Sequence, residues 1–312
     1  MPLSGSKRKC RREKNKMTSS VKRYSQAYLF IAPAIIILAI LYFYNFFFGL
    51  YLSLVEWVYY KPNTMGTFVG LKNYMLLIDD EQYITAILNS IIWSFSTVLL
   101  PFIISIPFAL LLNEELRGQR MFRALALLPW AVPVVVGGLI FRQLFHPQFG
   151  LINEVLVRLG LIKQPIMWFQ ETMLAFFVII LAQTWHNIPF YTITLLAGLQ
   201  AVPITLHEAA KIDGASAIQR FIHITVPTIK PVALVALLQS VIWSFHNFNI
   251  VMAVTGGGPY HSTEVLSTFA YFYAFSAGNV GKGAAISTTS VLLLAIFGVI
   301  WIRYMLKAVR GE

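Results

Sequence analysis

The residues best suited to bind a ligand lie in the apolar stretch 232–254, where polar side chains recur at helical spacing. Positions i, i+3, i+4 and i+7 of a helix share one face, and this is the spacing of Ser240, Trp243, Ser244 and Asn247. Their hydroxyl and amide groups can hydrogen-bond a neutral, hydroxyl-rich ligand, and the indole can cover its apolar side. A polar stripe on an apolar span usually faces the interior of a helical bundle. The same stripe could instead join neighbouring helices by hydrogen bonds, and the pattern alone leaves both interpretations open.

A second group of polar and aromatic residues, Trp185, His186 and Asn187, lies next to Pro189 in the apolar stretch 172–200. A helix that is broken by proline can expose backbone groups to a cavity at membrane depth. We therefore expect these three residues to make secondary ligand contacts. The alternative for His186 is a purely structural role within the bundle.

The motifs that would indicate covalent chemistry are incomplete. His207-Glu208 begins like the zinc motif H-E-x-x-H, but Lys211 stands where the second His is required. The stretch Gly278–Gly283 resembles a phosphate-binding P-loop, but its spacing is wrong. The single cysteine, Cys10, cannot form a disulfide within the chain. We therefore expect no catalytic residue, no metal and no cofactor in this chain.

The distribution of acidic residues disfavours two other classes of membrane protein. Carriers that couple to protons or ions usually keep carboxylates or bases inside the membrane, and no Asp, Glu or Lys lies in the middle of an apolar stretch. A stand-alone secondary carrier is therefore the weaker alternative. An integral membrane enzyme would need a cluster of acids or histidines near one interface, and the loops predicted to be cytoplasmic hold only isolated acids, namely Glu114, Glu115, Glu208 and Asp213.

The composition places the chain in the membrane. Of its 312 residues, 57% are hydrophobic and 12% are charged, about half of the charged fraction that is typical of soluble domains. Six apolar stretches are long enough to cross a bilayer as helices. We predict an all-α integral membrane protein with a basic tail (1–27) and a six-span domain (28–312), whose spans are 28–55, 83–112, 121–145, 172–200, 232–254 and 284–306.

The basic residues predict the orientation. Nine Lys and Arg residues precede the first span, and together with the loops 113–123 and 201–231 and the C-terminal end they make eighteen on one side, against five in the opposite loops. Short basic loops stay in the cytoplasm, so both termini are predicted to be cytoplasmic in a multi-pass protein. The net charge of +11 does not indicate nucleic-acid binding, because no soluble domain follows the tail to read bases.

The loop 203–231, between the fourth and fifth spans, is the longest polar segment in the second half of the chain. Thr205 can cap a helix, with Glu208 completing a capping box, and Gly214 permits the left-handed turn that ends it. We expect a second short helix from Ala215 to about Phe221, stopped by two prolines. On its pattern alone this loop could be an ordered connector or a docking element for a partner.

The loop resembles the EAA loop of ATP-binding-cassette importer permeases, which follows the pattern E-A-A-x-x-D-G-A, then an aromatic residue and P-x-x-x-P. The matching residues are Glu208-Ala209-Ala210, Asp213-Gly214-Ala215, Phe221, Pro227 and Pro231. In that family the loop carries the coupling helix that sits in a cleft of the ATPase subunit. The resemblance implies that Glu208, Ala209, Ala210, Asp213, Gly214 and Ala215 couple this chain to such a subunit.

A second pattern resembles the carbohydrate-type group of these permeases, which includes the maltose and glycerol-phosphate transport proteins. It is Thr255-Gly256-Gly257-Gly258-Pro259, followed by Ser262-Thr263-Glu264, and it is typical of the maltose-F-like partner. The resemblance covers most of residues 25–310 and fits the shorter six-span form. It implies that the polar stripe of 232–254 faces a saccharide.

The resemblance also implies the partners and the location. They are a second, similar permease, two ATPase subunits that hold ATP and Mg²⁺, an extracytoplasmic solute-binding protein, a saccharide substrate, and the lipid of a bacterial plasma membrane. No nucleic acid is expected, and the chain itself is expected not to be an enzyme. A permease for another solute, such as a phosphodiester or a peptide, is the alternative within the same family.

The predicted external loop 255–283 is rich in aromatic residues. They could form a belt at the membrane interface or part of a surface that receives the solute-binding protein. The residues concerned are Tyr260, Phe269, Tyr271, Phe272, Tyr273 and Phe275.

Overall fold

The computed structural model describes residues 28–114 and 117–310, so the predicted basic tail lies outside the described residues. The chain divides into two compact units at Ser53. The first contains an apolar helix, Tyr28–Ser53, which includes a π-helical stretch η1 (Ala39–Tyr44) and α2 (Asn45–Ser53). Most of its side chains from Tyr28 to Tyr51 are exposed, as expected of a helix that meets lipid or another chain, whereas Ser53 at its end is buried and belongs to the second unit.

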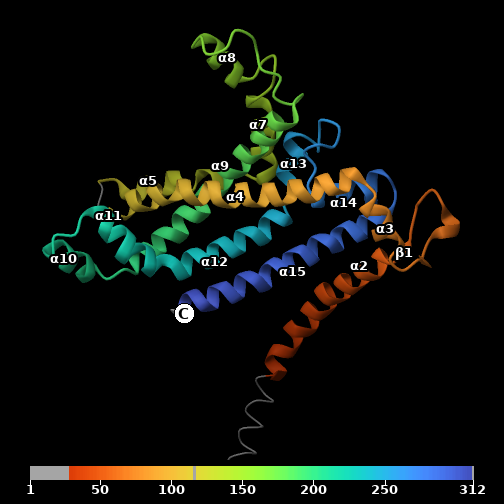
Figure 1. Cartoon of the computed structure of the whole chain (residues 1–312), viewed down its shortest axis with the longest axis horizontal. Helices are drawn as coiled ribbons and strands as arrows, with labels where there is room; N and C mark the ends of the chain where they lie inside the picture. The colour runs from red at the N-terminus through yellow and green to blue at the C-terminus, as the bar shows by residue number, and fades with distance from the viewer. Residues whose placement is uncertain (1–27, 115–116, 311–312) are drawn as a thin grey trace, which may run out of the picture. The chain divides into compact units, whose positions relative to one another are not determined.

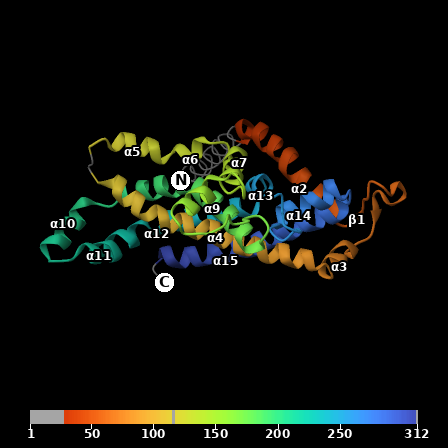
Figure 2. The same ribbon diagram turned by 90° about the horizontal axis from the view of Figure 1, so that it is seen from above.

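Four long helices dominate the second unit: α4 (Glu81–Asn113), α9 (Thr172–Gln200), α12 (Val226–Phe245) and α15 (Val280–Arg310). Helix α4 packs along α9, α12 contacts both, and α15 packs on α12 (Figures 1 and 2). Asp80 caps α4 by accepting hydrogen bonds from the backbone N–H groups of Gln82 and Tyr83 at 3.0 and 3.4 Å. The prediction of an all-α membrane fold is confirmed, with five described helices long and apolar enough to cross a bilayer.

The predicted third span, 121–145, is wrong as one continuous helix. The segment forms α5 (Gln119–Ala126), α6 (Leu128–Ala131) and α7 (Val134–Leu144). Pro129 lies in the first turn of α6 and Pro133 precedes α7. Pro129 is tolerated there because the first helical turn has N–H groups without partners, and Val132 is extended because proline disfavours helix in the residue before it.

The predicted fifth span, 232–254, is also wrong in its limits. The helix begins earlier, because α11 (Ala217–Arg220), a π-helical stretch η3 (Phe221–Thr225) and α12 follow without interruption. Pro227 and Pro231 therefore lie inside the helix rather than stopping it, and the wider π turn precedes them. The helix ends at Phe245, residues 246–248 are non-helical or form its cap, and α13 (Asn249–Val254) follows.

Short elements connect the long helices on the side predicted to be external. Residues after the first helix form an antiparallel pair, β1 (Val55–Glu56) and β2 (Thr67–Phe68), in which Val55 lies opposite Phe68. The helix α3 (Lys72–Ile78) leads to α4, and α8 (Leu151–Arg158) lies beyond α7 (Figure 1). The predicted external loop contains α14 (Leu266–Tyr271) and a π-helical stretch η4 (Phe272–Ser276).

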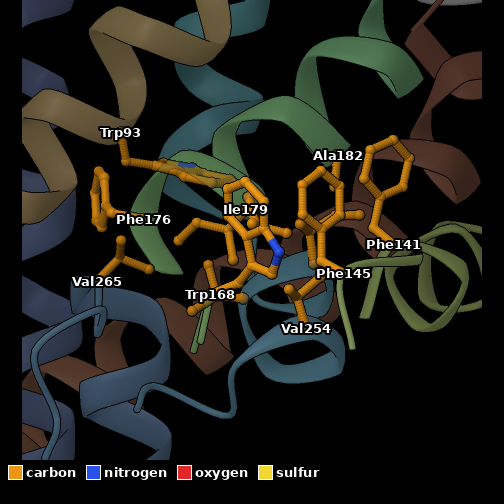
Figure 3. Packing of buried hydrophobic residues seen from close by; sticks show 12 residues of the cluster. Trp93, Phe141, Phe145, Trp168, Phe176, Ile179, Ala182, Val254 and Val265 are labelled. Carbon is orange, nitrogen blue, oxygen red and sulfur yellow. The ribbon is translucent and has the colours of Figure 1, made fainter. Parts of the chain in front are cut away.

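The largest buried cluster joins α4, α7, α9 and α13 (Figure 3). Phe145 and Trp168 meet edge to face with ring centroids 5.0 Å apart, and Trp93 is 1% exposed. A second cluster includes Phe269, which is fully buried with Leu77 and Tyr83. Phe269 therefore belongs to neither of the two surfaces considered for the aromatic residues of its loop.

Candidate functional site

The two serines of the predicted stripe lie where α12 packs against its neighbours. Ser240 is 3% exposed and Ser244 is 6% exposed. The Ser244 hydroxyl lies 2.6 Å from the Ser94 hydroxyl of α4, and the Trp93 indole N–H donates to the Ser244 carbonyl at 3.1 Å. Ser244 therefore joins α12 to α4 in this structure.

Asn247 lies at the break between α12 and α13, and its amide begins a chain of hydrogen bonds. Its Nδ2 donates to Gln183 Oε1 at 2.6 Å, and Gln183 Nε2 donates to Asn187 Oδ1 at 2.9 Å. Asn187 Nδ2 then donates to the Thr97 carbonyl of α4 at 3.2 Å. We call Gln183, Asn187 and Asn247 the amide chain. It brings together one residue from each predicted group and adds Gln183, whose signal in the sequence is its i, i+4 spacing to Asn187.

Trp243 departs from the stripe. It is 47% exposed, whereas the serines beside it are buried, so the four residues do not share one environment. Its ring packs edge to face on Phe190 of α9 at 4.9 Å, and Phe190 contacts Trp130 of α6 at 5.9 Å. Trp130 is also 47% exposed. These three half-exposed rings come from three helices. We call Trp130, Phe190 and Trp243 the aromatic surface.

Sequence analysis did not identify Trp130 or Phe190, because they meet Trp243 only through tertiary packing. Trp130 sits in the broken third span. Phe190 follows Pro189, which lies inside the continuous helix α9, so the predicted break of the helix at this proline is wrong. Phe190 lies three residues after Asn187 in α9, so the two side chains are on the same face of that helix. The aromatic surface and the amide chain are therefore adjacent along α9.

The other two residues predicted near Pro189 lie deeper in the bundle. Trp185 is half-buried and packs on Phe141 of α7 at 5.7 Å, against the main buried cluster. His186 is 8% exposed, and its Nδ1 has no hydrogen-bond partner among the described residues. A buried polar atom that makes no hydrogen bond costs about 1–3 kcal/mol of stability, so such atoms are rare in folded proteins.

A separate apolar groove with a volume of about 370 Å³ lies between α4, α12 and α15. Its lining includes Val241, Phe245, Phe297 and Trp301, and Ser94 is its one hydroxyl-bearing residue. A hydroxyl-rich ligand would leave most of its polar groups unpaired there, so this groove does not suit one.

The polar loop 203–231 projects a helix, α10 (Ile204–Ile212), and then turns sharply. Gly214 has φ +80°, in the left-handed region, and Ala215 N–H donates to the Ala210 carbonyl at 2.9 Å. Pro203, not Thr205, precedes the helix, so the predicted capping box at its start is wrong. The capping box is at α11 instead, where Ser216 and Gln219 bond each other's backbone N–H groups.

The coupling residues predicted from the loop lie on or just after α10. Glu208, Ala209, Asp213 and Gly214 are exposed, and Ala210 and Ala215 are half-buried. Glu208 makes no ion pair within the described part of the chain. Three isoleucines on the same loop are exposed by 71%, 87% and 71%, namely Ile204, Ile212 and Ile218. A loop with this much exposed apolar area is typical of a docking surface.

Comparison with protein families and curated proteins gives consistent matches. Residues 102–311 match the family described as binding-protein-dependent transport system inner membrane component. The chain is 36% identical to the trehalose/maltose transport system permease protein MalF of Thermococcus litoralis, over 93% of this chain and 97% of that protein. It is 34% identical to the sulfoquinovosyl glycerol transport system permease protein SmoG of Agrobacterium fabrum, over 89% of each.

Comparison with solved structures supports the same fold. The structure matches a chain of a bacterial ABC transporter involved in the import of the acidic polysaccharide alginate, with a TM-score of 0.78 and 21% identity. The match covers 94% of this chain and 99% of that one. A second match, with a TM-score of 0.76 and 22% identity, is to the alginate transporter in complex with an alginate pentasaccharide-bound periplasmic protein, over 91% of this chain and 94% of that one.

Proposed function

The chain belongs to the family of binding-protein-dependent transport system inner membrane components, and on that premise we propose that it forms half of the import path for a saccharide. It is a multi-pass membrane subunit of a transporter. In this proposal the other half of the path is a second, similar permease. Two separate ATPase subunits bind and hydrolyse ATP with Mg²⁺, so this chain catalyses no reaction, and both of its termini face the cytoplasm.

The aromatic surface is the observation that carries the saccharide proposal. Trp130, Phe190 and Trp243 present flat, half-exposed rings within segments that we predict to cross the membrane, and such rings are available for a ligand to stack on. Pyranose rings have apolar faces that pack on aromatic rings and edges that carry hydroxyl groups. The amide chain beside these rings supplies donors and acceptors for such hydroxyls.

A saccharide would have to compete with the bonds that the amide chain already makes. Gln183 uses both ends of its amide, accepting from Asn247 and donating to Asn187. A sugar hydroxyl can both donate and accept, so it could replace either partner without leaving an amide group unpaired. We propose that Asn187 and Asn247 contact the saccharide in this way, with Ser240, Ser244, Trp185 and His186 supporting the wall behind them.

A neutral saccharide fits these residues better than an anion. No Lys or Arg occurs in α6, in α9 or in residues 232–254. Phosphodiester recognition generally relies on Arg, Lys or the N-terminus of a helix. The relative that is named for trehalose and maltose agrees with a neutral saccharide.

The loop that carries α10 supports the proposed coupling to an ATPase. Its exposed isoleucines give an apolar surface that also carries the exposed charges of Glu208, Lys211 and Asp213, and the tight turn at Gly214 fixes its shape. We propose that Glu208, Ala209, Ala210, Asp213, Gly214 and Ala215 sit in a groove of the ATPase. Closure of the ATPase pair then moves α10 and, through α11 and η3, the helix α12 that bears Trp243.

The test is uptake of a panel of radiolabelled saccharides by proteoliposomes that contain the whole transporter and its solute-binding protein, with ATP hydrolysis measured in parallel. We expect Trp243→Ala to lower saccharide uptake per ATP hydrolysed, because one wall of the site is lost. Phe95→Ala is the matched control, since Phe95 is an exposed aromatic residue on the separate apolar groove. Equal effects of the two variants, or uptake without ATPase subunits, would refute the proposal.

A further inference from the structure

The glycine-rich turn, residues 255–264, is held by an unusually dense set of hydrogen bonds. Thr263 Oγ1 donates to the Gly258 carbonyl at 2.6 Å, and Thr263 N–H donates to the Gly257 carbonyl at 3.1 Å. The Ser262 N–H donates to the Pro259 carbonyl at 2.9 Å. A turn with this many internal bonds has one shape rather than many, so whatever it presents is already ordered.

The turn is also fixed to the long helices α4 and α9. Asn89 of α4 donates through Nδ2 to the carbonyls of Ser262 and Glu264 at 2.8 and 2.9 Å. Thr172, at the start of α9, donates to the Ser262 hydroxyl at 2.9 Å. Beneath the turn, the side chain of Glu264 is 5% exposed and bonds His261 Nδ1 at 2.8 Å. A Cβ at Gly257 would lie 2.6 Å from Glu264 Cγ, so the backbone rests directly on this side chain.

Tyr260 stands at the tip of this turn and is 95% exposed. It and His261 have φ of 49° and 63°, a left-handed conformation that is uncommon for residues other than glycine. Such conformations persist only where the surrounding structure enforces them, and they concentrate at functional sites. The enforced conformation holds a large aromatic side chain out in solvent, where its ring makes no hydrogen bond or ring contact with residues 28–114 or 117–310.

We propose that Tyr260 is the aromatic anchor by which this chain engages the extracytoplasmic solute-binding protein. The inference rests on the proposed function, including the external position of the turn. Tyrosine is one of the residues that most often dominate the binding energy of protein interfaces, because it buries a large area with few rotatable bonds. A rigid turn that presents one such ring fits a protein partner that arrives and leaves in each transport cycle.

The position of the turn favours this partner over lipid or the second permease. The turn follows directly from α13, which begins next to Asn247 of the amide chain. Just beyond the turn, Ser267 Oγ donates to the Asn247 carbonyl at 2.9 Å. Tyr260 is thus joined through a short, packed segment to the proposed saccharide site, which is where a protein that delivers the saccharide has to bind.

The experiment measures ATP hydrolysis by the whole transporter in lipid nanodiscs while the purified, saccharide-loaded solute-binding protein is titrated. We expect Tyr260→Ala to raise the half-saturating concentration of the solute-binding protein about ten-fold or more, with the maximal rate unchanged. Tyr260→Phe keeps the ring and should stay within about three-fold of wild type. Tyr60→Ala, at an exposed tyrosine of another external loop, is the matched control and should titrate like wild type.

A further variant moves the ring without removing it. Gly257→Ala forces the turn off Glu264, so it should also raise the half-saturating concentration although Tyr260 is intact. If Tyr260→Ala titrates like Tyr60→Ala, the proposal is wrong. It is also wrong if Tyr260→Ala lowers the amount of second permease that copurifies, or if its effect appears only on changing from zwitterionic to anionic lipid. If no solute-binding protein stimulates even the wild type, the proposed function fails, and this inference fails with it.

Discussion

Gly138 of α7 lies at a close contact between α7 and α13, the short helix that leads from the proposed site to the external turn. A Cβ built at Gly138 would lie 2.6 Å from the Cβ of Ala253 and 3.5 Å from Cγ2 of Val254. Two methyl carbons need a separation of about 3.5–4.0 Å, so Gly138→Ala would increase the distance between the two helices by about 1 Å. The neighbouring Gly137 has room, because its Cβ would lie 3.5 Å from the ring of Trp185.

The two glycines allow the clash to be isolated from the change in helix propensity. Replacing a helical glycine by alanine stabilises a helix by about 1 kcal/mol, and this gain applies equally at both positions. Overpacking costs about 1–3 kcal/mol, and only Gly138 meets it. We therefore expect Gly137→Ala to be neutral or stabilising, and Gly138→Ala to lie about 1–3 kcal/mol below it in the free energy of unfolding.

The assay is thermal unfolding of the purified complex in one detergent, followed for the two alanine variants and for a compensating pair. In Gly138→Ala/Ala253→Gly the methyl group moves from α13 to α7, so the clash disappears and stability should recover beyond the sum of the single changes. The reasoning is refuted if Gly138→Ala unfolds at the same temperature as Gly137→Ala. It is equally refuted if Ala253→Gly fails to rescue it.

Three further predictions concern other parts of the chain. Asn153 is 3% exposed and makes four hydrogen bonds at 3.0–3.1 Å that hold residues 147–168 together. We expect Asn153→Leu to lower the local stability of this segment by about 3–5 kcal/mol, which should appear as faster proteolysis between residues 145 and 171. The control variant Arg158→Leu should be cleaved at the wild-type rate. Gly214 has a left-handed φ and open space around its Cβ, so Gly214→Asn should keep more of the ATPase stimulation than Gly214→Val, and equal losses would contradict a conformational cause. Burial raises the pKa of the Glu264 carboxyl, and the hydrogen bond to His261 partly offsets this rise. Glu264 therefore binds a proton more tightly in the native turn than in the unfolded chain. The stability of the turn should fall as pH rises through the raised pKa. Hydrogen exchange at the turn should follow this trend, and Glu264→Gln should remove it; a pH profile that the substitution leaves unchanged would assign the dependence to another group.

The sequence by itself determined the class of fold and the turn at Gly214. Long apolar stretches can satisfy their backbone only as helices in a membrane, so 83–112 and 172–200 were predicted within a few residues of α4 and α9. The turn at Gly214 was predicted because only glycine adopts a positive φ without strain. Both are local properties of the chain, and for that reason a single sequence reveals them.

Only the tertiary structure decided what the helices do with their breaks and polar residues. Hydropathy treats 121–145 and 232–254 as continuous spans, because a proline or an asparagine changes an average over many residues very little. Whether such a residue ends a helix depends on the neighbours that take up the freed backbone groups. The partners of Asn247 and Trp243 are likewise set by packing, since Gln183 is 64 residues away in the sequence and Phe190 lies on another helix. Helical spacing predicts a shared face for these residues, but the helix ends before Asn247, and packing places Asn247 against an amide and Trp243 against an aromatic ring.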